Sequence, residues 1–122
     1  MKNPINTFFT KDVYDTEIRL DVNVDVLESL YDDGVSPTDK LPIEFVFITD
    51  VEENANRLKE NLSLQYPSYT DLEVEETQDY WEVHGITDVI EMNIDKVNEW
   101  NKAMWDIGYG HDCQLDGWQV GV

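Results

Sequence analysis

Residues 41–49 constrain the fold more than any other stretch, because their apolar side chains alternate onto both faces of one extended segment. The two faces would carry Ile43, Phe45 and Phe47 on one side, and Val46 and Ile48 on the other. A strand that is apolar on both faces typically lies inside a sheet rather than at its edge. The pattern therefore predicts a central strand.

A helix is predicted directly after this strand. Its apolar residues recur at helical spacing, at Val51, Ala55, Leu58 and Leu62. Asp50 is placed to cap the helix, with Glu53 three residues further on in a capping-box arrangement. Pro67 disfavours helical backbone at the residue before it, so the helix should end near Tyr66.

The next segment has the pattern of a β-hairpin. Residues 71–77 alternate between an apolar and an acidic face, which is typical of a half-buried strand. Residues 78–79 are expected to form a turn, and an antiparallel partner strand should begin at Trp81.

A second long helix and a last strand complete this half of the chain. Asn93 is a candidate cap for the helix, and Gly108 and Gly110 are expected to end it. Its apolar stripe is Ile94, Val97, Trp100, Met104 and Ile107. Residues 113–122 are predicted to form a strand in which Leu115 faces one way and a second set faces the other, namely Trp118, Val120 and Val122.

The first forty residues allow more than one interpretation. Residues 18–26 alternate as a strand would, whereas residues 22–32 also carry a helical stripe, made by Val22, Val26, Leu27 and Leu30. Gly34, just past this stripe, is a helix stop signal and favours the helix. Residues 1–16 fit neither period, and either pack on the domain or form an arm that orders on binding.

The element order defines the expected fold class. A helix followed by β-α-β-β-α-β predicts an α+β domain in which two helices cover one face of an antiparallel four-stranded sheet. This is the ferredoxin-like arrangement, here with an extra N-terminal helix. We expect a domain over residues 22–122 preceded by an extension over residues 1–21.

The charge of the chain excludes several classes of partner. Asp and Glu number 27 against 8 Lys and Arg, so the formal net charge is -19. A protein this acidic repels phosphate backbones and anionic membrane surfaces, and no basic stripe is present. The charge instead favours a basic protein partner. No apolar run approaches the ~18 residues of a membrane span, and no signal-peptide core is visible, so a cytoplasmic location is expected.

Residues that could carry catalysis or bind a metal are few. The sequence contains only two histidines, His84 and His111, and one cysteine, Cys113, which leaves no intramolecular disulfide. The spacing of His111, Asp112 and Cys113 is not that of a zinc site. No catalytic motif and no phosphate-binding loop is present, so neither a catalytic residue nor a cofactor or metal is expected. An enzyme or metal-binding domain that uses the acidic residues together with His84, His111 and Cys113 is the least favoured of three hypotheses.

Aromatic residues are better candidates for a binding surface. Trp100 fits the core stripe of the second helix, whereas Trp105 lies toward the edge of that stripe. Tyr80 and Trp81 are neighbours on a predicted strand, so one of them should face away from the core. Because Trp and Tyr are enriched at binding hot spots, the candidate partner contacts are Tyr80, Trp81 and Trp105.

Three short motifs together resemble one family. Residues 27–34 (LESLYDDG) and 40–47 (KLPIEFVF), followed by the Asp-Gly-Trp of residues 116–118, are similar to the regulator of ribonuclease E activity B (RraB) family in sequence and in order. The resemblance covers about residues 22–122 and implies helix rather than strand over residues 22–32.

The resemblance also implies a function. Members are protein inhibitors of ribonuclease E, so it implies a non-enzymatic modulator that binds an endoribonuclease and alters RNA degradation. The residues carried over by motif position, with an architectural role, are Asp33, Gly34, Asp116, Gly117 and Trp118. A bend or a bulge at Asp116-Gly117 would aim Trp118. The chain departs from the family in its N-terminal extension and in stopping at Val122 without a long acidic tail.

Two functional hypotheses therefore lead. The first is a protein-binding regulator, monomeric or dimeric, whose partner is a ribonuclease or another basic protein. The second is an immunity-type protein that neutralises a basic nuclease toxin through complementary charge. The first predicts binding that weakens as salt is added. A toxin gene directly adjacent in the genome would support the second.

Overall fold

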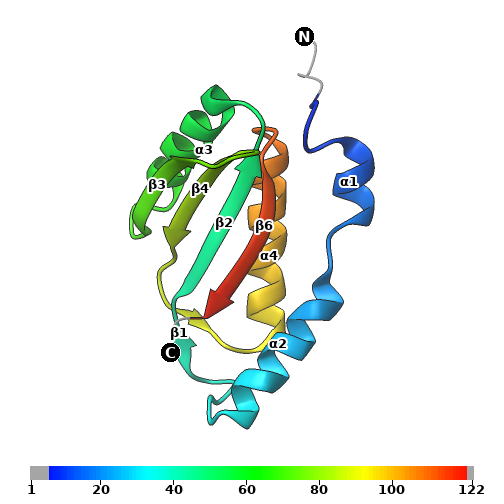
Figure 1. Ribbon diagram of the computed structural model, residues 1–122. Coiled ribbons are helices and arrows are strands. Elements are labelled where there is room, and N and C mark those ends of the chain that lie inside the picture. The colour runs from blue at the N-terminus through cyan, green and yellow to red at the C-terminus, as the bar shows by residue number, and fades with distance from the viewer. Residues whose placement is uncertain (1–5, 121–122) are drawn as a thin grey trace.

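The computed structural model describes residues 6–120, which form four helices and two antiparallel sheets (Figure 1). The helices are α1 (Lys11–Thr16), α2 (Leu20–Asp32), α3 (Glu52–Gln65) and α4 (Ile94–Tyr109). The strands are β1 (Lys40–Leu41), β2 (Ile43–Thr49), β3 (Thr70–Glu76), β4 (Trp81–Ile86), β5 (Ile90–Glu91) and β6 (Gln114–Val120). Within the described residues no helix has the length and apolarity that a bilayer crossing requires.

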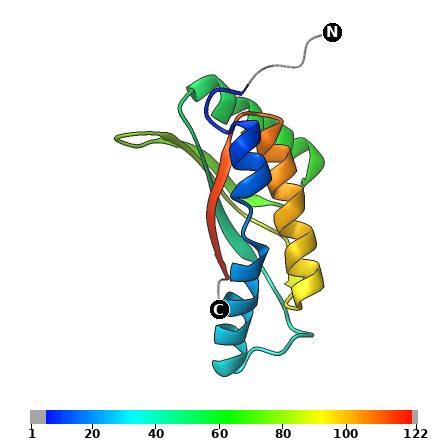
Figure 2. The same cartoon turned by 90° about the vertical axis from the view of Figure 1, so that its right-hand side faces the viewer.

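The larger sheet has four strands in the order β3-β4-β2-β6, with every neighbouring pair antiparallel. β2 lies between β4 and β6, which confirms the central strand predicted from its two apolar faces. Helices α3 and α4 cover one face of this sheet, while no helix within residues 6–120 covers the other face (Figures 1 and 2). Alternate residues of β2 are accordingly buried and half-buried.

The predicted strand over residues 41–49 is divided at Pro42. Proline has no backbone N–H and cannot donate to a sheet ladder, so β1 ends before it and β2 begins after it. β1 pairs instead with β5, with Lys40 opposite Glu91 and Leu41 opposite Ile90. This two-stranded sheet was not predicted, because both of its strands are too short to show a period.

Helix α2 confirms the helical interpretation of residues 22–32. Leu27 of the predicted stripe is buried and Val26 and Leu30 are half-buried, whereas the prediction is wrong for Val22. Val22 is 40% exposed, and the buried residues of α2 are Asn23 and Leu27. Asn23 turns inward because its amide donates to Asn98 Oδ1 (2.9 Å) and to Asn101 Oδ1 (3.0 Å) on α4. A polar contact therefore sets the rotation of this helix.

The end of α2 is a Schellman motif. Gly34 has a φ of 102°, a left-handed conformation that glycine adopts without a Cβ penalty. Its N–H donates to Tyr31 O (3.1 Å), and the Val35 N–H donates back to Leu30 O (3.0 Å). The stop signal predicted at this glycine is confirmed.

The predicted caps of the two later helices have different outcomes. Asn93 caps α4 as predicted, since its Oδ1 accepts the Lys96 N–H at 2.9 Å. The capping box at Asp50 is wrong, because the N-cap position of α3 is Val51, one residue later, and no side chain caps it. Helix α3 ends before Tyr66, as Pro67 predicted, whereas α4 continues through Gly108 to Tyr109.

A β-bulge decides which way the last strand presents its side chains. Val46 pairs with Gly117 but Phe47 pairs with Leu115, so Asp116 is the extra residue in β6. The bulge shifts the alternation by one position and places Leu115 and Trp118 on the same, helix-covered face. The prediction that they face opposite ways is therefore wrong. Val122, also assigned to this strand, lies outside the described residues.

The N-terminal segment packs on the domain from residue 6 onward; residues 1–5 lie outside the described part. The segment is held by hydrogen bonds to Asp112, a buried residue with a φ of 55° in the turn between α4 and β6. The Asp112 carboxylate accepts backbone N–H groups of Thr7 (3.0 Å), Phe8 (3.0 Å) and Phe9 (2.6 Å). Phe9 is fully buried in the core.

Candidate protein interface on the open sheet face

The face of the sheet opposite α3 and α4 carries side chains from all four strands. The register places Glu73 opposite His84 on the β3 side, and Val46 opposite both His84 and Gly117. The side chains that share this open face are Glu44, Val46 and Ile48 of β2, Glu82, His84 and Ile86 of β4, Glu73 and Glu75 of β3, and Gln119 of β6. We call this set the open face.

The open face is hollowed rather than flat. The hairpin of β3 and β4 projects away from the helices, so the sheet curls on its open side (Figure 2). The open face contains a groove of about 510 Å³, which is lined by residues of all four strands. Gly117 contributes to the groove because it has no side chain, and the position of its missing Cβ has no atom within 4 Å. Val46 and Ile86 supply an aliphatic part of the lining.

Charge on the open face has one sign. Glu44, Glu73, Glu75 and Glu82 lie on it, and Asp71 lines the groove. Every Lys and Arg among residues 6–120 lies on a helix, on β1, or at Arg19 just before α2, so none lies on the four-stranded sheet. Acidic groups gathered without counter-charge create a negative potential that attracts basic partners. An aliphatic lining ringed by carboxylates is the pattern of an interface for a basic protein surface.

The aromatic candidates have different environments. Tyr80 is 40% exposed in the hairpin turn, where its ring meets Phe8 edge-on at 5.6 Å. Trp81 is half-buried and pairs with Thr49, which turns it toward the covered face. Trp105 is only 5% exposed, so the surface of the folded domain does not present it.

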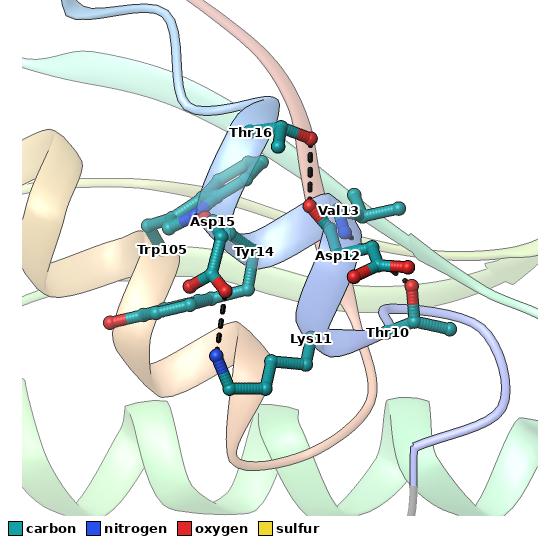
Figure 3. A network of polar contacts seen from close by, with 8 residues as sticks. All are labelled: Thr10, Lys11, Asp12, Val13, Tyr14, Asp15, Thr16 and Trp105. Atoms are coloured by element: carbon teal, nitrogen blue, oxygen red, sulfur yellow. Dashed lines mark hydrogen bonds and ion pairs between the residues drawn. The ribbon is translucent and has the colours of Figure 1, made fainter.

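Trp105 is buried by residues of the N-terminal segment. Phe9 packs edge-on against the Trp105 ring at 4.6 Å between centroids. The indole Nε1 donates to Tyr14 O at 3.0 Å, and Figure 3 shows the Trp105 ring beside Tyr14 on α1. The N-terminal segment thus covers this side of α4, which its sequence pattern could not reveal.

The residues carried over from the family motifs are spread over the fold. Asp33 and Gly34 end α2. Asp116 forms the exposed bulge of β6, and Trp118 lies on the covered face, edge-on to Trp100 at 5.9 Å. Gly117 and Trp118 also line the groove of the open face, whereas Asp33, Gly34 and Asp116 do not.

The three residues of the enzyme hypothesis do not share one environment. His84 lies on the open face, whereas Cys113 is buried in the core. Burial raises the pKa of the Cys113 thiol to about 12, so the thiol stays protonated near neutral pH and is a poor nucleophile. His111 Nδ1 lies 2.9 Å from Ile107 O in the turn after α4.

The acidic residues of the open face were not identified as a group from the sequence. Alternation alone places Glu73 and Glu75 on one face of β3 and predicts that this face is acidic. Whether Glu44 and Glu82 lie on the same face as these two residues depends on the register between strands. That register is set by pairing between segments that are far apart in the chain.

Fold and face together define a class of protein, namely a small α/β domain with one sheet face covered by helices and the other open, hollowed and acidic. Residues 20–120, most of the chain, match the family model described as RraB, regulator of ribonuclease activity B. The chain therefore belongs to the RraB family, and the resemblance seen in its motifs is confirmed. The family is one of regulators of ribonuclease activity. No curated protein matched the sequence significantly.

Proposed function

We propose that this protein is a non-enzymatic regulator that binds a ribonuclease as a protein partner, and that its open face makes the contact. Membership of the RraB family supports regulation of a ribonuclease. The observation that carries the choice of surface is the absence of any Lys or Arg from the four-stranded sheet within residues 6–120. The carboxylates there would meet the basic surface with which a ribonuclease holds RNA.

The proposed contact has an electrostatic and an apolar part. Carboxylates such as Glu44 and Glu73 would steer the encounter and fix its register, a contribution that falls as salt screens the charges. Val46 and Ile86 would be desolvated at the centre of the contact, where binding energy concentrates. Tyr80, exposed at the tip of the adjoining hairpin, is a proposed additional contact, and so is the half-buried Trp81.

We infer the finer features of the fold and setting from the same observations. The order β2-α3-β3-β4-α4-β6 supports a ferredoxin-like domain over residues 22–122, with residues 1–21 as an extension. Asp33, Gly34, Asp116, Gly117 and Trp118 are proposed to be architectural residues of that domain. A regulator of ribonuclease activity acts where RNA is degraded, so we propose a cytoplasmic location.

The experiment that tests this function is calorimetric titration with ribonuclease E, or its counterpart from the same organism, at low and moderate salt. The double variant Glu44→Gln/Glu73→Gln should weaken binding roughly 10-fold at low salt, since it removes two rim charges that contribute about 0.5–1 kcal/mol each. A matched control, Glu28→Gln/Glu60→Gln, removes the same charge from exposed positions on α2 and α3 and should change binding little.

Equal weakening by both double variants would show that net charge alone drives binding and would refute the open face as the interface. Absence of binding to the ribonuclease at low salt would refute the proposed partner. Capture of a basic nuclease toxin in a pull-down, with that toxin inhibited, would then favour the immunity-type alternative.

A further inference from the structure

Three potential metal ligands meet on the open face. Glu75 of β3 and Glu82 of β4 are directly opposite each other, and His84 lies two residues further along β4 on the same side of the sheet. One ligand atom from each of the three lies within 4.8 Å of those of the other two. The spacing of these residues along the chain does not reveal the group, since it is assembled only by the pairing of two strands.

The paired carboxylates lack a basic neighbour. Like charges directly opposite on adjacent strands destabilise a sheet. Among the described residues, no Lys or Arg forms an ion pair with Glu75 or Glu82; both carboxylates lie instead beside His84 Nε2. The site therefore holds two negative charges and is suited to a bound cation.

Two carboxylate oxygens, one from Glu75 and one from Glu82, lie close to His84 Nε2. Nε2 lies 3.1 Å from Glu82 Oε1 and 3.4 Å from Glu75 Oε2. The Nε2 atom itself is buried, although the His84 side chain is 40% exposed, and it has no hydrogen-bond partner among residues 6–120. Ligands of a tetrahedral zinc ion, with bonds of about 2.0–2.1 Å, lie about 3.4 Å from one another. The two distances from Nε2 to the carboxylate oxygens are thus close to the spacing that zinc requires, and one ligand atom of each of the three residues lies within 4.8 Å of the others.

We propose that Glu75, Glu82 and His84 bind one Zn²⁺ ion, with a fourth coordination position left open at the protein surface. A histidine nitrogen combined with carboxylate oxygens favours zinc over Mg²⁺ and Ca²⁺, which prefer oxygen ligands throughout. Three ligands with an open fourth position resemble accessible zinc sites rather than closed structural ones. The bound ion would also neutralise the charge of the opposed Glu75 and Glu82.

The proposal is tested on the full-length chain, purified without a His-tag and freed of metal, by calorimetric titration with ZnCl₂. We expect one ion per chain and at least a 10-fold loss of affinity in each of Glu75→Gln, Glu82→Gln and His84→Asn. The matched controls are Glu73→Gln, which removes an equally exposed carboxylate directly across from His84, and His111→Asn; both should bind Zn²⁺ within about twofold of the parent. Circular dichroism checks that each variant is folded.

The site would be overturned if the parent chain did not bind Zn²⁺, or if His84→Asn bound it as tightly as the parent. An equal loss of affinity in Glu73→Gln would also overturn it, because that result would indicate diffuse attraction of the ion to the acidic face. Loss of the Zn²⁺ signal on adding equimolar MgCl₂ would also contradict it. Because no ribonuclease is present, the outcome is independent of the function proposed above.

Discussion

Gly108 lies where the last turn of α4 passes the backbone that leads into β6. A Cβ at this position would overlap the carbonyl oxygen of Cys113 and lie 3.0 Å from Phe47 Cε2. The sequence suggested that Gly108 ends the helix, but its role is a close approach: its carbonyl accepts the Cys113 N–H at 2.9 Å. Backbone atoms cannot move aside as the end of a flexible side chain can.

Gly108→Ala is therefore expected to lower the free energy of unfolding by about 2–4 kcal/mol, through backbone displacement and overpacking in the core. Urea denaturation monitored by tryptophan fluorescence measures the change. Gly110→Ala is the matched control, because its nearest atom would be at 3.5 Å and its φ of -65° suits alanine. Equal effects of the two substitutions would contradict this account of Gly108.

At the scale of elements, the N-terminal segment is held by its first residues rather than by helix α1. Helix α1 has six residues and none of them is buried, so it contributes little stability by itself. The attachment consists of the Asp112 carboxylate, which binds three successive backbone N–H groups, and of Phe9, enclosed by the rings of Trp105 and Tyr109.

Phe9→Ala should accordingly destabilise the whole domain by about 3–4 kcal/mol, since it leaves a cavity beside Trp105 and Tyr109. The measurement is again the free energy of unfolding in urea. Phe8→Ala removes a ring that is half-buried at the edge of the core, where it meets Tyr80 edge-on, and should cost clearly less. If Phe9→Ala left the stability unchanged, the segment would not be part of the folded core.

At the scale of the whole molecule, charge is abundant and unevenly distributed. The formal net charge is -19, and the ion pairs that involve Lys or Arg in residues 6–120 are exposed and lie within short sequence separations, such as Lys11–Asp15 and Arg57–Glu53. Such pairs contribute little to stability. Repulsion among the remaining carboxylates therefore opposes the compact state.

Added salt should stabilise this protein. Raising NaCl from about 0.01 M to 0.1 M shortens the Debye length from about 30 Å to about 10 Å and screens the repulsion. We expect the midpoint of thermal unfolding to rise by several degrees over this range, measured by circular dichroism at constant pH. A midpoint that falls or stays constant would mean that self-repulsion does not limit stability. An equal osmolarity of sucrose is the control for non-ionic effects.

The sequence by itself determined the kinds of elements and their order. Period-two and helical spacings, with stops at Gly34 and before Pro67, correctly predicted helices α2, α3 and α4 and the strands of the larger sheet. These signals are local, because each depends on backbone preferences and on apolar spacing within one segment. The family motifs are local in the same sense, and the match over residues 20–120 confirmed them.

Only the tertiary structure decided which side chains share a surface. The bulge at Asp116 placed Leu115 and Trp118 on one face, a polar contact of Asn23 set the rotation of α2, and Phe9 buried Trp105. The open face and its Glu75–Glu82–His84 group likewise depend on strand register. Each of these features depends on contacts between residues far apart in the chain. The spacing of residues within one segment does not predict such contacts.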